Sequence, residues 1–219
     1  MEIDHAILKH YLRNVYFING TSYAGKSTIC KMISDRLGLI HCGENYNHSE
    51  FLKLADSNKY PNINYFKTMK NWEEFVSRTP KEYSDWLVHT ARELVPFELI
   101  ELISLSRNQK VIVDTNLPVD VLKKIADDDH VAILLADEDL AVNEFFNRSD
   151  PEKKFILEKI NKTKNPEETL NNYRESIRKA NNQEVIAEYE KSGFKCFWRT
   201  KDSLLEDRYK EVIRHFKLI

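Results

Sequence analysis

The feature that most constrains this chain is the segment GTSYAGKST at residues 20–28. Its Gly-x-x-x-x-Gly-Lys-Ser spacing follows the β-branched and aromatic run VYFI at 15–18 and opens the amphipathic segment KSTICKMISDRL at 26–37. A glycine-rich loop between a strand and a helix is typical of a phosphate-binding site. The glycines let several backbone N–H groups point at one anion, and the helix N-terminus adds partial positive charge. We therefore expect this loop to bind a nucleoside triphosphate.

Each residue type in the loop has a use in binding phosphate and Mg²⁺. Gly20 and Gly25 allow the backbone to curl, and Lys26 is expected to reach the β- and γ-phosphates with an exposed ammonium group. Ser27 offers a hydroxyl to Mg²⁺, and Thr28 adds a donor near the α-phosphate. A plain glycine turn with a surface lysine is the weaker alternative, because a strand and a helix flank the loop. The residues expected to hold the nucleotide are Gly20, Thr21, Ser22, Ala24, Gly25, Lys26, Ser27 and Thr28.

The charge balance favours small ligands over polyanions. The 219 residues include 33 Lys and Arg against 35 Asp and Glu, so the basic excess of a general nucleic-acid binder is missing. The three cysteines form no Cys-x-x-Cys pair, which is typical of free thiols in a reducing compartment. Charges at residues 2 and 4 disfavour a signal peptide, and no apolar run approaches the roughly 18 residues of a membrane span. We expect a soluble, cytoplasmic monomer or homodimer with one α/β domain over residues 1–219.

Short β-rich apolar runs alternate with longer amphipathic segments, which predicts a parallel sheet covered by helices on both faces. Five parallel strands are expected at 15–18, 38–42, 111–114, 131–136 and 195–198. Helices are expected at 26–37, 119–126, 138–148, 166–191 and 202–216. Pro166 suits the first turn of its helix, and Asp202 is expected to cap the last one. The buried face of that last helix is expected to contain Leu205, Tyr209, Val212 and Phe216.

Two segments depart from this alternation. Residues 43–107 are mainly helical and too long for a single crossover, and Pro96 is expected to kink or divide a helix there. Residues 148–166 form a polar, lysine-rich segment after the fourth strand.

The loop by itself is compatible with hydrolysis, switching or phosphoryl transfer. A GTPase needs Asp-x-x-Gly and Asn-Lys-x-Asp motifs, and the nearest match, NKTK at 161–164, lacks the aspartate. An oligomeric motor ATPase usually has an acidic pair after its second core strand, whereas Asp114 is followed by Thr115. Both alternatives are therefore weakened.

The layout of the chain resembles that of the P-loop nucleoside and nucleotide kinase superfamily. It combines the loop near the N-terminus, a strand ending in one acid, an arginine-bearing polar segment after the fourth strand and a short strand before the C-terminal helix. Within the superfamily it is similar to small-molecule kinases such as shikimate kinase, gluconate kinase and chloramphenicol phosphotransferase. The resemblance covers nearly the whole chain in layout, and the phosphate loop is its specific motif.

The resemblance implies a P-loop NTPase fold: a three-layer α/β/α structure with a five-stranded parallel sheet in the order 2-3-1-4-5. It also implies a helical acceptor-binding region at about 43–107 and a mobile lid at about 148–166. ATP and Mg²⁺ would be the cofactors, and the phosphate acceptor would be a small molecule with a hydroxyl group.

Phosphoryl transfer needs a carboxylate that orients or deprotonates the acceptor, and carboxylates or hydroxyls that hold Mg²⁺. Asp114 ends the apolar strand VIVD and is expected beside the phosphate loop, where it would hold Mg²⁺ with Ser27 or face the acceptor. Glu44 follows the second strand, where similar kinases place an acceptor-facing acid, although the Asp-x-Asp common in them is missing here. Capping of a turn by Asp114 and simple solvation of Glu44 are the alternatives. The sequence does not decide which of the two acids faces the acceptor.

Three arginines are candidates for contacts with the phosphates. Similar kinases place an arginine in the lid that clamps the transferring phosphate, and Arg148 matches that position. Arg174 and Arg178 lie four residues apart on one helix face, where they would lean over the nucleotide. Pairing of these two with Glu175 or Glu184 on the surface is the alternative.

Nine of the 24 aromatic residues lie between residues 46 and 86, which would suit a planar or partly apolar acceptor, although helix packing explains them equally well. Arg78 and Arg92 are candidates for contacts with an anionic acceptor. The spacing of His41, Cys42 and His48 fits no zinc-ligand pattern, and a fourth ligand is missing.

Two functions from different classes remain after the sequence is considered. The first is an ATP-dependent phosphotransferase acting on a hydroxyl of a small molecule, with Lys26, Glu44, Asp114 and Arg148 as its catalytic residues. The second is a regulatory module that binds ATP or GTP without transferring phosphate. A nucleic-acid end kinase is disfavoured by the near-neutral charge.

Overall fold

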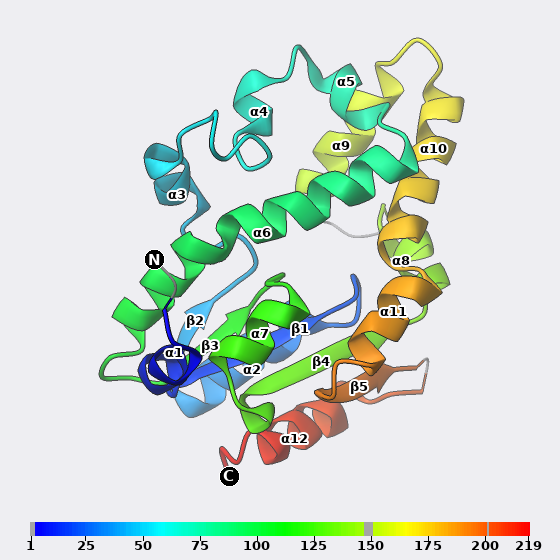
Figure 1. Ribbon diagram of the computed structural model, residues 1–219. Helices are drawn as coiled ribbons and strands as arrows, with labels where there is room; N and C mark the ends of the chain where they lie inside the picture. Colours follow the sequence, from blue (N-terminus) through cyan, green and yellow to red (C-terminus); the bar gives the residue numbers. More distant parts are fainter. Residues whose placement is uncertain (1–2, 147–150, 201) are drawn as a thin grey trace.

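A computed structural model of the protein describes residues 3–146, 151–200 and 202–219. Its five strands all run parallel in the order β2-β3-β1-β4-β5, which confirms the expected three-layer α/β/α fold (Figure 1). The strands are β1 (Val15–Gly20), β2 (Ile40–Cys42), β3 (Val111–Asp114), β4 (Val131–Ala136) and β5 (Lys195–Arg199). In the central pairs, Ile18 lies beside Asp114 and Gly20 beside Leu134. The carboxyl ends of β1, β3 and β4 therefore meet at one edge of the sheet.

Helices cover both faces of this sheet and extend above it (Figure 1). The first six are α1 (His5–Leu12), α2 (Lys26–Leu37), α3 (His48–Leu54), α4 (Tyr65–Thr68), α5 (Trp72–Val76) and α6 (Pro80–Leu105). The others are α7 (Val119–Ile125), α8 (Glu138–Glu144), α9 (Pro151–Asn161), α10 (Pro166–Ala180), α11 (Gln183–Glu190) and α12 (Leu205–His215). A short 3-10 turn, η1 (Asp128–His130), leads into β4.

Alternate residues of the strands supply two separate cores, as the period of two in a strand requires. Val15, Phe17, Val113 and Ile133 face the layer formed by α1, α6, α7 and α11. The intervening residues, among them Ile18, face α2 and α12 on the other side. Because both faces are covered, all six residues of β1 and all six of β4 are buried.

The segment 43–107 folds into the four helices α3 to α6, and α6 runs as one long helix above the sheet (Figure 1). Pro96 was expected to kink or divide a helix, and it does not divide one, because α6 continues across it. Contacts on both sides of Pro96 hold α6 in place: Glu93 accepts the backbone N–H groups of Asn62 and Ile63, and Glu98 accepts a hydrogen bond from Thr115. These contacts offset the intrahelical hydrogen bond that a proline removes.

The expected single helix at 166–191 is in fact two, because the chain breaks at Asn181 and Asn182. Asn182 caps α11 by accepting the N–H of Val185 at 3.1 Å, so its own backbone leaves the helical conformation. Pro166 lies in the first turn of α10, as expected.

The last helix begins at Leu205 rather than at Asp202, which is not its cap. The reason is a separate turn in which the Ser203 hydroxyl accepts the N–H of Thr200 at 2.9 Å. Leu205 is 42% exposed, whereas the other three residues expected on the buried face are buried: Tyr209, Val212 and Phe216.

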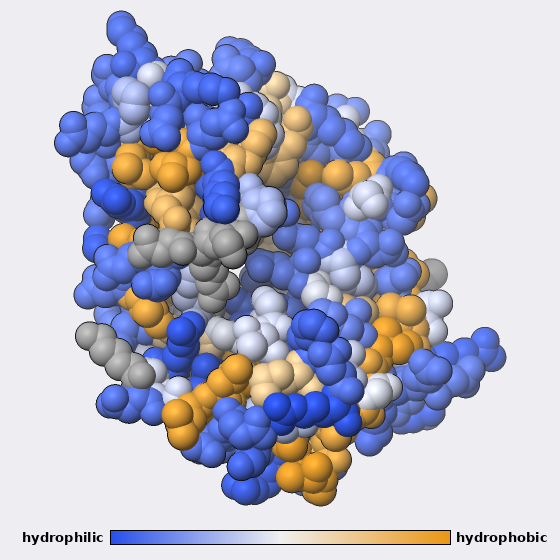
Figure 2. Space-filling model, turned by 180° about the vertical axis from the view of Figure 1, so that it is seen from behind, coloured by the Kyte–Doolittle hydropathy of each residue, from blue (hydrophilic) through white to orange (hydrophobic). Residues whose placement is uncertain are grey.

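Most of the face seen from behind is hydrophilic, with apolar side chains gathered in separate patches (Figure 2). Within the described residues, none of the helices is long and apolar enough to cross a bilayer.

Candidate functional site

The loop expected to bind phosphate leaves β1 at Gly20 in a conformation that residues with a side chain rarely adopt. Gly20 has φ +128°, and a Cβ atom there would lie 1.8 Å from the Leu134 carbonyl oxygen. The next residue, Thr21, donates its N–H to that same carbonyl at 3.0 Å, and its hydroxyl accepts the N–H of Ala136 at 2.9 Å. The Thr21 side chain therefore fastens the start of the loop to β4 rather than facing the loop interior.

Cationic side chains bind the carbonyl groups of the loop. Lys26 Nζ donates to the carbonyl oxygens of Gly20 and Thr21, at 3.2 and 3.1 Å. Arg199, at the end of β5, donates to the Tyr23 carbonyl at 2.6 Å. The expectation of an exposed Lys26 ammonium was wrong, because the residue is only 8% exposed and its ammonium group folds onto the loop.

Arg208 binds the remaining end of the loop. This α12 residue is 6% exposed and donates a hydrogen bond to the Ala24 carbonyl. Its guanidinium group lies close to Gly25, because a Cβ atom on that glycine would be 3.1 Å from Arg208 Nη1. Burial lowers the pKa of the Arg208 guanidinium, and the positive charge of Arg199 lowers it further. Two guanidinium groups from the C-terminal part of the chain thus lie against the loop.

These contacts fix the direction of the loop N–H groups. The described peptide bonds are all trans, so each N–H points away from the carbonyl of the preceding residue. Because the Tyr23 and Ala24 carbonyls are bound by arginines, the N–H groups of Ala24 and Gly25 point to the opposite side. Helix α2 begins directly after Gly25, which has φ +88°, and its first-turn N–H groups have no intrahelical acceptor. The loop and the start of α2 therefore present an uncompensated set of donors, which suits an anion.

Ser22 differs from the other loop residues because its N–H is already used. It donates to Asn181 Oδ1 at 2.7 Å, and Asn181 Nδ2 donates in turn to the Ile177 carbonyl at 2.8 Å. Asn181 is 2% exposed and lies where α10 ends. This contact ties the loop to the α10–α11 junction, and it makes the Ser22 N–H a structural donor in this conformation.

Ser27 and Asp114 lie together, as the sequence predicts. Ser27 Oγ donates to Asp114 Oδ2 at 2.6 Å, while Asp114 Oδ1 is buried without a hydrogen-bond partner among the described residues. Burial raises the pKa of the Asp114 carboxyl; the Lys26 charge and the bond from Ser27 oppose this rise, and the charge of Glu44 adds to it.

A hydroxyl and a carboxylate with an unused oxygen are hard oxygen ligands, which fit Mg²⁺. The described residues contain no group of three or more His, Cys, Asp or Glu side chains that could hold a metal ion. A site with two protein oxygens agrees with the habit of Mg²⁺ of taking its other ligands from phosphates and water.

Glu44 lies in the turn after β2, exposed to solvent. Asn116, two residues after Asp114, donates to Glu44 Oε1 at 3.3 Å. Glu44 is therefore close enough to the end of β3 to act on Asp114 electrostatically, and its exposed oxygens are open to a ligand.

Two of the three arginines expected at the phosphates lie on α10 and contact neighbouring side chains. Arg148 lies outside the described residues. Arg174 is exposed and contacts Asn171 on its own helix at 3.4 Å. Arg178 pairs with Glu175 at 3.0 Å and with Asp139 of α8 at 3.6 Å. For Arg178 the structure thus has the surface pairing that the sequence left as an alternative.

The aromatic residues of 46–86 pack mainly against one another. Tyr46, Phe51 and Tyr60 pack with Phe97 of α6, and most of the others form a second group with α8, α9 and α10. Helix packing therefore accounts for much of this enrichment.

The two arginines expected to meet an anionic acceptor have other neighbours. Arg78 stacks on aromatic rings, with its guanidinium carbon 3.8 Å from the Tyr65 ring centre and 5.3 Å from that of Trp86, beside a pocket of 430 Å³. Arg92 pairs with Asp120 of α7 at 3.0 Å.

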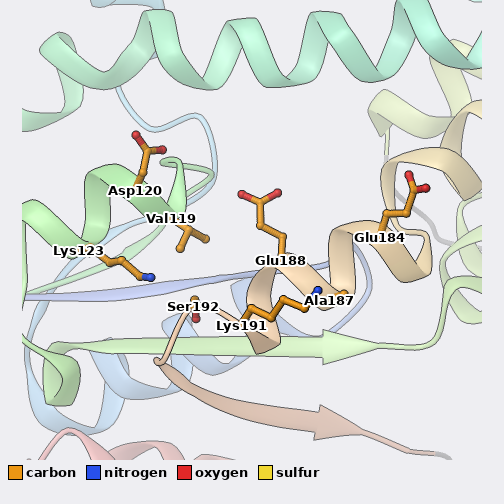
Figure 3. Close-up of a pocket in the computed structure, with 8 residues that line it drawn as sticks. All are labelled: Val119, Asp120, Lys123, Glu184, Ala187, Glu188, Lys191 and Ser192. Carbon is orange, nitrogen blue, oxygen red and sulfur yellow. The ribbon is translucent and has the colours of Figure 1, made fainter.

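A second pocket, of 490 Å³, lies between α7 and α11 (Figure 3). Acidic and lysine side chains both line it, and the Glu188 carboxylate points from α11 toward α6 (Figure 3). Residues expected in the nucleotide or acceptor site are not among its lining residues, which are Val119, Asp120, Lys123, Glu184, Ala187, Glu188, Lys191 and Ser192.

Sequence reasoning missed the residues that hold the loop from outside, namely Asn181, Arg199 and Arg208. A usable signal existed for one of them, since the pair Asn181–Asn182 interrupts an otherwise helical pattern. A comparison of the chain with protein-family models gave no match, and curated proteins gave none either.

Proposed function

We propose that the protein is an ATP-dependent phosphotransferase that moves the γ-phosphate to a hydroxyl group of a small molecule. The observation that supports this proposal is that arginine side chains donate hydrogen bonds to the carbonyl groups of the loop. Arg199 and Arg208 hold the carbonyls of Tyr23 and Ala24, which leaves the adjacent N–H groups and those of the first turn of α2 directed at one anion site.

Binding of the triphosphate draws on groups that are already in place. Lys26 is within reach of the loop interior, and turning its ammonium group from the Gly20 and Thr21 carbonyls to the β- and γ-phosphates keeps it hydrogen-bonded. Bound Mg²⁺ would neutralise part of the phosphate charge. Ser27 Oγ and Asp114 are the chain's own ligands for it.

Transfer requires an acid beside the acceptor hydroxyl. The oxygen of the acceptor hydroxyl forms a bond to the γ-phosphorus as the bond from phosphorus to the ADP oxygen breaks. The proton of that hydroxyl passes to a carboxylate. Glu44 is the better placed of the two acids, since it is exposed near the end of β3, whereas Asp114 is buried and one of its oxygens accepts from Ser27. The free cysteines Cys30, Cys42 and Cys196 agree with a cytoplasmic location.

The proposal is tested by measuring ADP release with Mg²⁺ and a panel of hydroxyl-bearing acceptors. We expect acceptor-dependent ADP release in the wild type and a loss of about 100-fold or more in Lys26→Ala, as for removal of a charge-stabilising donor. Lys31→Ala is the matched control, because Lys31 lies on the same helix but is exposed and pairs with Asp35. Equal turnover in Lys26→Ala would contradict the proposal. ATP binding with no transfer to any acceptor would favour a nucleotide-binding regulatory module.

A further inference from the structure

The buried face of α6 carries an acid where an apolar residue would be expected. Leu94, Glu98 and Leu102 are the buried residues of this helix, spaced four apart. A carboxyl group in a core costs free energy even when it is hydrogen-bonded, and a leucine would complete the stripe. Packing alone therefore does not explain Glu98.

Glu98 begins a chain of buried hydrogen bonds that ends at the phosphate loop. Thr115 Oγ1 donates to Glu98 Oε2 at 2.8 Å and accepts the Leu117 N–H at 3.0 Å. The Leu117 carbonyl accepts Asn19 Nδ2 at 2.7 Å, and Asn19 Oδ1 accepts the Gly20 N–H at 2.6 Å. Every side chain in this chain of bonds is buried.

The far end of the chain is the point where the loop leaves the sheet. The Gly20 peptide cannot shift toward β4, because the Leu134 carbonyl fills the space beside it. Asn19 Oδ1 also accepts the Tyr189 hydroxyl of α11 at 3.1 Å, so the orientation of this amide is fixed from two sides. At the near end, Thr115 directly follows Asp114, which binds Ser27.

We propose that Glu98 is a positioning residue for the nucleotide site. It acts through Thr115 and Asn19 on the peptide of Gly20, so that a change at the middle of α6 alters the phosphate loop. Its effect on nucleotide affinity rests on the proposed function, whereas its effect on the Gly20 peptide does not.

The first test uses the protein alone. Amide hydrogen exchange is measured by NMR at Gly20 and, as a reference within the same strand, at Phe17. Glu98→Leu should speed exchange at Gly20 about tenfold relative to Phe17, the equivalent of one hydrogen bond. Glu98→Gln should keep the wild-type ratio of the Gly20 and Phe17 exchange rates, because the amide oxygen of the glutamine still accepts a hydrogen bond from Thr115. Leu94→Ala, on the same stripe but outside the chain, should leave the ratio unchanged.

The second test measures binding of ATP with Mg²⁺ by calorimetry, where Glu98→Leu should weaken affinity about tenfold and Glu98→Gln should not. If Glu98→Leu leaves the ratio of the Gly20 exchange rate to the Phe17 exchange rate unchanged, the inference is overturned and the proposed function stays intact. If this exchange ratio changes in Glu98→Leu but the wild-type protein binds no ATP, the positioning of Gly20 by Glu98 is supported and the proposed function is overturned. Should Glu98→Leu fail to fold, Thr115→Val removes the same hydrogen bond between Thr115 and Glu98. This variant must then show the faster amide exchange at Gly20.

Discussion

Asp114 and Glu44 have opposite surroundings, which separates their expected roles at the scale of single residues. Asp114 is 2% exposed and bonded to Ser27, whereas Glu44 is exposed and contacts Asn116. Asp114→Asn should lower turnover at least 100-fold and raise the Mg²⁺ concentration required, because the proposed Mg²⁺ site loses a charge. Glu44→Gln should lower kcat about 100-fold with unchanged nucleotide and Mg²⁺ affinity, because proton acceptance is lost.

Titrations of ATP and Mg²⁺ against both variants assign the two acids, with Asp120→Asn on the surface of α7 as the control. A silent Glu44→Gln variant, together with an Asp114→Asn variant that is inactive at saturating Mg²⁺, would make Asp114 the acceptor base instead.

The motif predicted a loop between a strand and a helix with a curled backbone at its two glycines, which the structure has, but it gave the wrong exposure for Lys26. The sequence led us to expect an exposed ammonium group at Lys26, because a motif contains no information about which carbonyls are nearby. Arg199 and Arg208 were not foreseen because they reach Tyr23 and Ala24 across 176 and 184 residues of sequence. A contact of that range leaves no local pattern.

At the scale of elements, the break between α10 and α11 combines two functions in neighbouring asparagines. Asn182 caps α11, so Asn182→Ala should cost about 1 kcal/mol of stability and leave ATP affinity unchanged. Asn181 holds the Ser22 N–H, so Asn181→Ala should both destabilise the protein and weaken ATP binding several-fold. Urea unfolding and calorimetric titration of the two variants measure the difference. Equal ATP affinity in both would show that the Ser22 contact does not shape the nucleotide site.

Strands were the elements predicted best, because buried parallel strands appear as short apolar runs such as VIVD and VAILLA. Element ends depended on side chains that form their own turns. Ser203 and Asn182 shifted two boundaries, because a hydroxyl or amide that binds the backbone competes with the helix.

At the scale of the whole molecule, Glu98 makes stability depend on pH. Burial raises the pKa of Glu98 from 4.5 to about 7. The folded state therefore holds this proton more tightly than the unfolded state does, and the wild type should lose up to about 3 kcal/mol as pH rises from about 4.5 to 7. Glu98→Gln removes this dependence, so its stability relative to the wild type should increase from pH 5 to pH 8. Urea unfolding across that range measures the change, and parallel pH curves for the two proteins would contradict it.

The helical region formed by α3 to α6, α9 and α10 lies above one edge of the sheet (Figure 1). The sequence indicated most of this region, without α10, through two segments that interrupt the alternation of strands and helices, 43–107 and 148–166. Its internal packing was beyond prediction, since rings such as Tyr65 and Trp86 suit a ligand pocket and a helix interface equally well. The structure shows that Arg78 stacks on both of these rings.

The three tryptophans are divided between two parts of the molecule. Trp72 and Trp86 belong to the aromatic group of the helical region, whereas Trp198 lies on β5, is 39% exposed, and directly precedes the arginine that holds the Tyr23 carbonyl. The protein therefore carries built-in fluorophores in both the helical region and the sheet. Trp198→Phe should leave a tryptophan emission spectrum that comes from the helical region alone, and the difference from the wild-type spectrum isolates the signal of β5 at the residue that precedes Arg199.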